Sequence, residues 1–402
     1  MDADALYKQL HAHPELSFAE HETAALLAGL LGELGYEVIT GIAGTGLVGI
    51  LRNGDGGTVL LRADMDGLPV REETGLPWAS VDTAVDHNGD RVPVMHACGH
   101  DIHMTCLIAA AEELADTRNE WSGTVIALFQ PAEERGGGAA AMVADGLFTR
   151  IPHPDIVLGQ HVFQRPAGVV GAHSGAAFSA IDTMEVTMHG RGGHGSRPET
   201  TIDPVLMAAS TVVRLQGVVS REVAAQNAAV VTVGHLNAGT KNNIIPDDAR
   251  LGVSVRSFDA AVRTRVLDAV ERIIRAEAVA SGSPALPDIV YGEQYPLTYN
   301  DPESTARVMQ AFEAEFGDER VSDPTQHIGS EDVGALAIAA GVPLVYWILG
   351  GGDPDAIAEA RATGTFAERI PSNHSPRFAP LPQPTISAGT RALVVAARIW
   401  LV

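Results

Sequence analysis

The stretch MHACGHDIHMTCLIAAAEEL, residues 95–114, places a cluster of metal-ligand side chains directly before an apolar helical segment. Cys98, one of two cysteines in the chain, lies two positions before His100, with His96 and His103 on either side. A cysteine and a histidine at this spacing can both reach one metal ion from a turn or strand end, which is typical of a transition-metal site. The remaining ligands and a general base have to come from elsewhere in the chain.

The segments around this motif alternate between strand and helix patterns. Apolar strand-like runs and helical runs follow one another closely, with Gly-rich turns between the first strands. The predicted strands are 36–43, 46–53, 58–65, 124–131 and 155–162, and the predicted helices are 2–12, 19–34, 101–114 and 138–145. Alternation with nearly all-apolar strands favours an α/β fold with a parallel or mixed sheet covered on both faces.

The pattern changes near residue 180, where a second unit is expected. Its predicted order is β-α-β-β-α-β, that of a split βαβ or ferredoxin-like α+β domain. The segments are 183–190, 203–219, 228–239, 249–258, 260–282 and 288–293. Helices and an apolar strand resume after Tyr295. We therefore expect a catalytic α/β domain in two parts, 1–179 and 294–402, interrupted by an inserted domain at 180–293.

Composition excludes several classes of partner. The 402 residues are 46% hydrophobic and 19% charged, as in globular proteins, and the formal net charge is −23. This charge would be repelled by phosphate backbones and anionic membranes, so neither nucleic acid nor a membrane is an expected partner. No signal peptide or spanning run is visible, and two cysteines make no disulfide framework. A cytoplasmic location is expected.

A carboxylate pair provides the next candidate residues. Glu133 and Glu134 follow the apolar strand 124–131, at the strand end where α/β sheets usually place their sites. One carboxylate can bind metal while its neighbour moves protons. The alternative is an acidic first turn favoured by the helix dipole, and the pair alone does not separate the two.

Two further histidines are candidate metal ligands only when they are considered together with the other ligand-type residues. His161 ends the strand in LGQHV and His374 lies in the loop PSNHSP, and each alone is more often structural or simply exposed. Together with Cys98, His100 and Glu134 they make five ligand-type residues in one predicted domain. Five is too many for one closed tetrahedral site and suits two metal ions sharing a water.

Two other interpretations rank lower. The segment GTGLVG (44–49) matches the dinucleotide fingerprint, but it continues as strand and turn where that motif needs a helix. A nucleophilic Cys98 with a histidine partner is possible chemically. It leaves Glu133, Glu134 and the distant histidines without a role, so we place it below the metal site.

Motifs through almost the whole chain carry a family resemblance. They are LHAHPELSFAEHET (10–23), LRADMDGLPV (61–70), MHACGHDIHM (95–104), FQPAEERGGGA (129–139), GQHV (159–162), GRGGHGSRP (190–198), NNIIPDDARLGVSVRS (242–257), GSEDVG (329–334) and NHSPRF (373–378). The chain resembles the metal-dependent amidohydrolases typified by hippurate hydrolase, N-acyl-amino-acid aminoacylases and indoleacetyl-amino-acid hydrolases. These belong to the superfamily of aminoacylase-1 and dinuclear-zinc carboxypeptidases.

The resemblance implies a role for each matching residue in the first and last parts of the chain. Glu133 becomes the general base, and Asp66 in the ADMD stretch a carboxylate close to the metals. The implied ligands of two divalent ions (Zn, Mn, Co or Ni) are Cys98, His100, Glu134, His161 and His374.

The inserted segment resembles the family's lid or dimerisation domain, which implies a homodimer or a dimer-based oligomer. His194 in GRGGHG would polarise the scissile carbonyl, in some relatives across a dimer interface, and Asn243 would contact substrate. Because KNN stands at 241–243, where relatives vary, the contacting Asn is left open. Arg256 is a candidate anchor for a substrate carboxylate; a structural arginine that pairs with protein carboxylates is an equal alternative.

The implied activity is hydrolysis of the amide bond of small-molecule N-acyl amino acids, which releases a carboxylic acid and a free amino acid. A metallo-dipeptidase or carboxypeptidase on the same scaffold is the first alternative. A binding or scaffold protein without activity is the second, and the complete set of ligands and base argues against it.

Overall fold

The computed structural model describes residues 1–402 and divides into two units. Unit 1 consists of Met1–Ala177, Tyr299–Gln326 and Asp332–Val402, and unit 2 of Phe178–Thr298 and His327–Glu331. The segment 180–293 lies within unit 2, but two details differ from the expected boundaries. Strand β15 continues to Tyr295. The short segment His327–Glu331 joins unit 2 because Ser179 donates its backbone N–H to the carbonyl oxygen of Gly329 at 3.0 Å.

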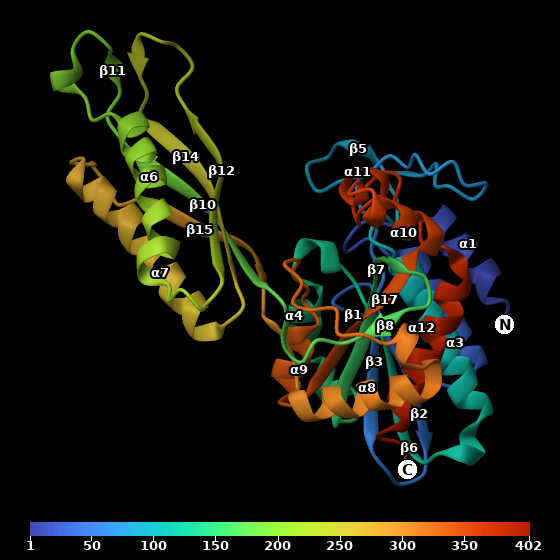
Figure 1. The fold of residues 1–402 in the computed structure, drawn as a ribbon. Helices are drawn as coiled ribbons and strands as arrows, with labels where there is room; N and C mark the ends of the chain where they lie inside the picture. The colour runs from blue at the N-terminus through green and yellow to red at the C-terminus, as the bar shows by residue number, and fades with distance from the viewer. The chain divides into compact units, whose positions relative to one another are not determined.

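A seven-stranded mixed sheet forms the centre of unit 1 (Figure 1). Its order is β1 (Glu37–Ile42), β2 (Gly46–Asn53), β6 (Gly123–Gln130), β3 (Thr58–Asp64), β7 (Ile156–Pro166), β17 (Leu344–Gly352) and β8 (Val170–Gly171). The neighbours β6, β3, β7 and β17 run parallel, whereas β1, β2 and β8 are antiparallel additions. The α/β class with a mixed sheet, predicted from strand–helix alternation, is confirmed.

Helices lie on both faces of this sheet, as its apolar strands require. On one face α3 (His100–Asp116) packs against α12 (Pro382–Arg398) and α1 (Ala3–Ala12), and α2 (His21–Glu33) lies beside β1 and β2. On the other face α4 (Gly138–Ala144) contacts α9 (Gly334–Ala340), as Figure 1 shows. The remaining elements of the two outer parts are α5 (Leu147–Arg150), α8 (Pro302–Phe316), α10 (Pro354–Ala362), α11 (Phe366–Arg369), β4 (Thr83–Val85), β5 (Arg91–Pro93), β9 (Gly175–Phe178) and β16 (Thr298–Asn300).

A glycine turn sets the direction in which α3 leaves the opening motif. Gly99 has φ +86°, and a Cβ added there would lie 2.3 Å from Cγ1 of Val162. Only glycine fits that close approach in a left-handed conformation. The helix that follows is buried on almost every side, including His100 and Asp101 in its first turn. Cys98 therefore directly precedes, and His100 directly follows, a glycine whose conformation is fixed.

The segment GTGLVG enters strand β2 and no helix follows it, as the sequence indicated. It lacks the helix N-terminus that a dinucleotide site uses.

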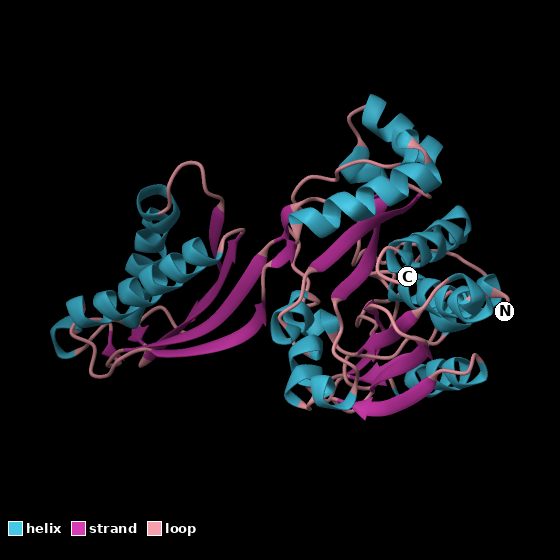
Figure 2. Ribbon diagram, turned by 90° about the horizontal axis from the view of Figure 1, so that it is seen from below, coloured by secondary structure: helices cyan, strands magenta, loops and turns pink.

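Unit 2 has a four-stranded antiparallel sheet with both long helices on one face (Figure 2). In chain order its elements are β10 (Ala180–His189), α6 (Pro204–Glu222), β12 (Ala229–Ala238), β14 (Asp248–Ser257), α7 (Ala260–Ala280) and β15 (Asp288–Tyr295), and the sheet order is β12-β14-β10-β15. A short ribbon of β11 (Gly193–His194) and β13 (Ile244–Ile245) extends from it. Apolar side chains between sheet and helices form its own core. None of the helices in the chain has the length and apolar character needed to span a bilayer.

Candidate metal centre and catalytic base

The candidate residues of unit 1 collect at the carboxyl edge of the parallel strands. Strand β6 ends at Gln130, just before Glu133, and β3 ends at Asp64, just before Asp66. Because these strands are parallel neighbours, both ends meet at one edge of the sheet, where α/β folds place their sites. His161 is not at a strand end as expected, because β7 runs on to Pro166. The last paired residues of β3 and β7 are Arg62 and Gly159, so His161 lies two residues past this pairing, level with Asp64 at the end of β3.

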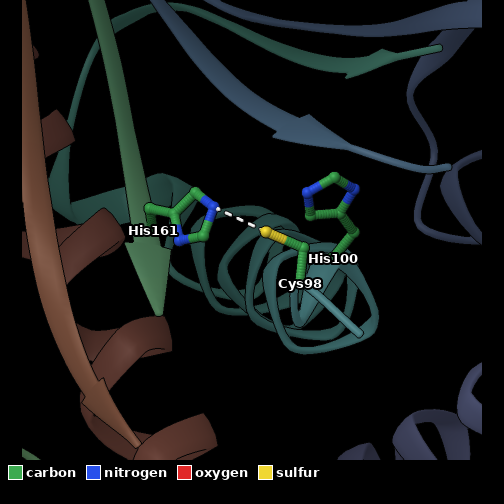
Figure 3. A group of neighbouring side chains, drawn as sticks. All are labelled: Cys98, His100 and His161. Atoms are coloured by element: carbon green, nitrogen blue, oxygen red, sulfur yellow. Dashed lines mark hydrogen bonds between the residues drawn. The ribbon is translucent and has the colours of Figure 1, made fainter. Parts of the chain in front are cut away.

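Two imidazoles and a thiol face one another there (Figure 3). Sγ of Cys98 lies 3.4 Å from Nε2 of His161. His161 donates its Nδ1–H to the Val162 carbonyl at 2.9 Å, and His100 donates its Nδ1–H to the Asp66 carbonyl at 2.8 Å. In the neutral form of both rings, Nε2 is therefore the nitrogen that carries the lone pair. A carbonyl acceptor on the other ring nitrogen is the usual arrangement for a metal-binding histidine.

Glu134 and His374 complete the cluster from the other side. Oε2 of Glu134 lies 3.3 Å from Nε2 of His374. The loop that carries His374 is fixed by its neighbour Asn373, whose side-chain amide donates to the carbonyl oxygens of Cys98 at 3.2 Å and Val162 at 3.0 Å. Sequence reasoning missed Asn373. Its adjacency to His374 was the only signal, and a hydrogen bond spanning 275 residues has no sequence pattern.

These side chains form two groups that share one residue. The potential ligand atoms of Cys98, His100 and His161 lie within 4.8 Å of one another, and so do those of Cys98, Glu134 and His374. Two buried atoms in these groups, Nε2 of His100 and Oε1 of Glu134, have no hydrogen-bond partner. Leaving buried polar atoms unpaired is costly, and a cation between them would satisfy both. The residues present therefore fit two metal ions, which these two groups would hold.

The electrostatics of the site point the same way. Burial and the negative charges of Glu134 and Glu133 raise the pKa of the Cys98 thiol well above its usual range. Burial lowers the pKa of His100, but the carboxylates, Asp64 above all, outweigh it and raise the value to about 10. A site so rich in negative charge favours cations. Without a cation the raised pKa keeps the Cys98 thiol protonated, which disfavours a free nucleophile; a bound cation would favour the thiolate as a ligand.

Glu133 is held beside these groups through its own backbone. Asp66 accepts the N–H of Glu133 with Oδ1 and the N–H of Glu134 with Oδ2, each at 3.1 Å. Ser17 donates its hydroxyl to the same carboxylate at 2.6 Å. Glu133 is 5% exposed and lies within 4.8 Å of His100 and Glu134, yet it belongs to neither group that contains Cys98.

A buried network behind the site was also missed. His103 contacts Oδ1 of Asp64 through Nδ1 at 2.6 Å and accepts the Val162 N–H with Nε2 at 2.9 Å. Arg62 donates to the other oxygen of Asp64 at 2.7 Å. Both nitrogens of His103 are thus engaged within the protein. The spacing of Asp64 and Asp66 was the available signal, because residues two apart on an extended chain face the same side.

A second histidine ties α1 to α3 close by. His11 contacts Oδ2 of Asp101 at 2.6 Å through Nδ1 and Oε1 of Glu72 at 3.0 Å through Nε2. Burial lowers the pKa of His11, but hydrogen bonds to these two carboxylates outweigh burial and raise it to about 10. Asp101, which His11 contacts, directly follows His100 in helix α3.

The remaining candidates lie in unit 2. His194 on β11 pairs with Ile244, and the N–H of Gly195 donates to the Asn243 carbonyl at 2.9 Å, so His194 and Asn243 are neighbours. The Ser196 N–H donates to Nδ1 of His194 at 3.1 Å, which leaves Nε2 to carry the proton. Arg256 lies elsewhere in the unit, where its Nη1 donates to the Ile328 carbonyl at 2.9 Å.

Residues 60–367 match the family described as Peptidase family M20/M25/M40. The chain belongs to this family. It is 43% identical to the hippurate hydrolase of Campylobacter jejuni over 277 residues, which are 68% of this chain and 69% of the relative. It is 35% identical to thermostable carboxypeptidase 2 of Saccharolobus solfataricus over 85% of this chain and 84% of the relative.

A solved structure of a dinuclear metal-binding peptidase from Bacillus subtilis covers 99% of this chain and 97% of its own, with TM-score 0.78 and 26% identity. The resemblance found in the sequence motifs is confirmed. So is the expectation of a metal-dependent hydrolase, because the relatives are hydrolases and the ligand groups are present.

Proposed function

We propose that this protein hydrolyses the amide bond of N-acyl amino acids and releases a carboxylic acid and a free amino acid. Cys98, His100, Glu134, His161 and His374 would hold two divalent cations. The observation that carries the proposal is the membership of Cys98 in both ligand groups, with the carboxylate Glu133 beside them.

Bound divalent cations would supply Lewis acidity, which lowers the pKa of a water and stabilises negative charge on a carbonyl oxygen. Glu133 would accept the proton of the attacking water and donate it to the departing amine. Its position supports this role, because the backbone N–H groups of Glu133 and Glu134 both donate to the Asp66 carboxylate and so fix the turn. A fixed base loses less entropy on reaching the reactive geometry.

His194 would donate a hydrogen bond to the substrate carbonyl oxygen as negative charge develops there. The contact from Ser196 supports this role, because it places the ring proton on Nε2, the nitrogen free to donate. Asn243 is the proposed neighbouring substrate contact. Arg256 stays a candidate for the substrate carboxylate through nitrogens other than the one bound to Ile328.

We infer a homodimer formed through unit 2. Strand β12 lies at the sheet edge, and its exposed side chains include Val230 and Leu236. An exposed edge strand is a ready surface for pairing with another chain. We also place the reaction in the cytoplasm; the two cysteines, Cys98 and Cys106, are both unpaired, which suits a reducing compartment.

A carboxypeptidase or dipeptidase activity is the second candidate, supported by the similarity to the archaeal carboxypeptidase. A substrate panel separates the two. Metal-reconstituted protein is assayed with acetyl-, benzoyl-, indoleacetyl- and long-chain acyl-amino acids, and with matched dipeptides. The proposal expects kcat/KM to be highest for an acyl-amino acid. A preference for dipeptides across the panel would establish the second candidate instead.

A further inference from the structure

A buried carboxylate from the N-terminal motif reaches the turn that carries the base. Glu20, at the start of helix α2, is fully buried. Its Oε1 accepts the backbone N–H of Ala132 at 2.9 Å and that of Phe18 at 3.0 Å. Its Oε2 accepts the hydroxyl of Thr45 at 2.6 Å. Ala132 directly precedes Glu133, and it lies 112 residues from Glu20 in the chain.

The two N–H groups on Oε1 belong to residues in an uncommon conformation. Phe18 has φ +62° and Ala132 has φ +51°, and neither is glycine. Left-handed backbone at such residues persists only where surrounding contacts enforce it, and it clusters at functional sites. One carboxylate oxygen therefore secures two strained residues from distant segments. The strain at Ala132 matters more, because it sets the direction of the next peptide.

The turn as a whole is an anion-binding loop filled by the protein's own side chains. Three successive N–H groups, those of Ala132, Glu133 and Glu134, end on carboxylates. The Asp66 carboxylate accepts the N–H groups of Glu133 and Glu134, and the Glu20 carboxylate accepts that of Ala132. Successive N–H groups in a left-handed then right-handed turn form a concavity that favours negative charge. Without Glu20, the first N–H would be buried and unpaired.

We propose that Glu20 is a positioning residue for the general base: it holds Ala132 in the left-handed conformation that directs Glu133 toward the metal centre. This inference rests on the proposed function of Glu133. The hydrogen bonds of the Glu20 carboxylate go to the backbone N–H groups of Phe18 and Ala132 and to the Thr45 hydroxyl. Its effect passes through the backbone of Ala132.

The contacts distinguish two substitutions. In Glu20→Ala the Ala132 N–H loses its acceptor, and the turn is free to relax. In Glu20→Gln the amide oxygen can still accept from Ala132 and Phe18, while the amide nitrogen can donate to the Thr45 hydroxyl. Glutamine should therefore restore most of the positioning, although it removes the charge.

Glu15 supplies a matched control on the same segment. Its carboxylate accepts the N–H groups of Glu22 at 3.2 Å and Thr23 at 2.8 Å, and so supports the start of α2 without contacting the base turn. Glu15→Ala should lower the melting temperature and leave kcat close to wild type. Glu20→Ala should lower kcat by about 100-fold, the scale expected for a misplacement near 1 Å, with KM and metal content near wild type.

The experiment compares Glu20→Ala, Glu20→Gln and Glu15→Ala as metal-loaded enzymes, well below their melting temperatures. Hydrogen–deuterium exchange of peptides covering 128–136 provides a readout independent of turnover. We expect faster exchange there only in Glu20→Ala, and recovery of most lost kcat in Glu20→Gln. Wild-type exchange in Glu20→Ala, or a kcat loss no larger than in Glu15→Ala, would overturn the inference. Wild-type inactivity on every substrate would refute the proposed function, while the exchange data would still decide whether Glu20 holds the turn.

Discussion

Replacing Glu133 by glutamine removes the proposed base and little else. The hydrogen bond that fixes this residue joins its backbone N–H to Asp66 at 3.1 Å, so the side-chain change leaves it intact. The side chain is isosteric and stays in the same buried space. Neither ligand group containing Cys98 includes Glu133. Metal content and melting temperature should both stay near wild type.

The expected loss is in the chemical step. General-base catalysis contributes about 10²- to 10⁴-fold, which corresponds to about 3–5 kcal/mol in the activation barrier. Glutamine cannot accept the proton of the attacking water, so kcat should fall by that factor while KM changes little. Release of glycine from benzoylglycine, together with elemental analysis of the same samples, measures both quantities.

The adjacent Glu134→Gln variant is the control for this experiment. Glu134 belongs to a group containing Cys98 and His374, so its loss should remove metal as well as activity. If Glu133→Gln retains activity within a factor of ten, or loses metal as Glu134→Gln does, the division of roles between the two carboxylates is wrong.

Three further outcomes are expected. His194→Ala should lower kcat by about 10²-fold with metal content unchanged, and an unaltered kcat would remove this residue from the mechanism. Gly99→Ala should cost about 2–4 kcal/mol in urea unfolding, because it combines a left-handed conformation with a Cβ 2.3 Å from a buried methyl. Gly89→Ala, also left-handed (φ +88°) but in open space, should cost only about 1 kcal/mol, and equal losses would contradict the packing argument. His11 has a folded-state pKa of about 10 because Asp101 and a second carboxylate outweigh burial, so its stabilising effect is full below its unfolded pKa near 6.5 and is lost as pH rises toward 10. The stability gap between wild type and His11→Gln should therefore shrink from pH 6.5 to pH 10, and a gap that widened would refute the assignment.

Most helices and strands could be predicted, because their hydrophobic patterns lie within short segments of the chain. Strand β2 matches its predicted segment 46–53, and α3 differs from its prediction by only a few residues. Helix α12 was not predicted. It begins at Pro382 with a second proline two residues on, and this start obscures an otherwise apolar helical stretch. The predicted strand 155–162 is four residues shorter at its end than β7, because the pattern alone does not show that β17 pairs with β7 as far as Pro166.

The candidate ligands stand in sequence motifs and could be named from the sequence, whereas residues that contact the site through backbone groups could not. Asn373 fixes its loop by bonding carbonyl oxygens, and Glu20 bonds a single N–H far along the chain. Carbonyl and N–H groups are the same at every residue, so no side-chain pattern marks such partners. The structure was needed to bring them together.

Metal titration of chelated enzyme tests the central claim most directly. Metal is removed completely, and Mn, Co or Zn is added back in steps while glycine release from benzoylglycine is followed. Two ligand groups joined at Cys98 predict no activity without metal and a plateau at about two equivalents per chain. Hydrolysis that survives complete metal removal, or a plateau at one equivalent, would contradict the dinuclear site.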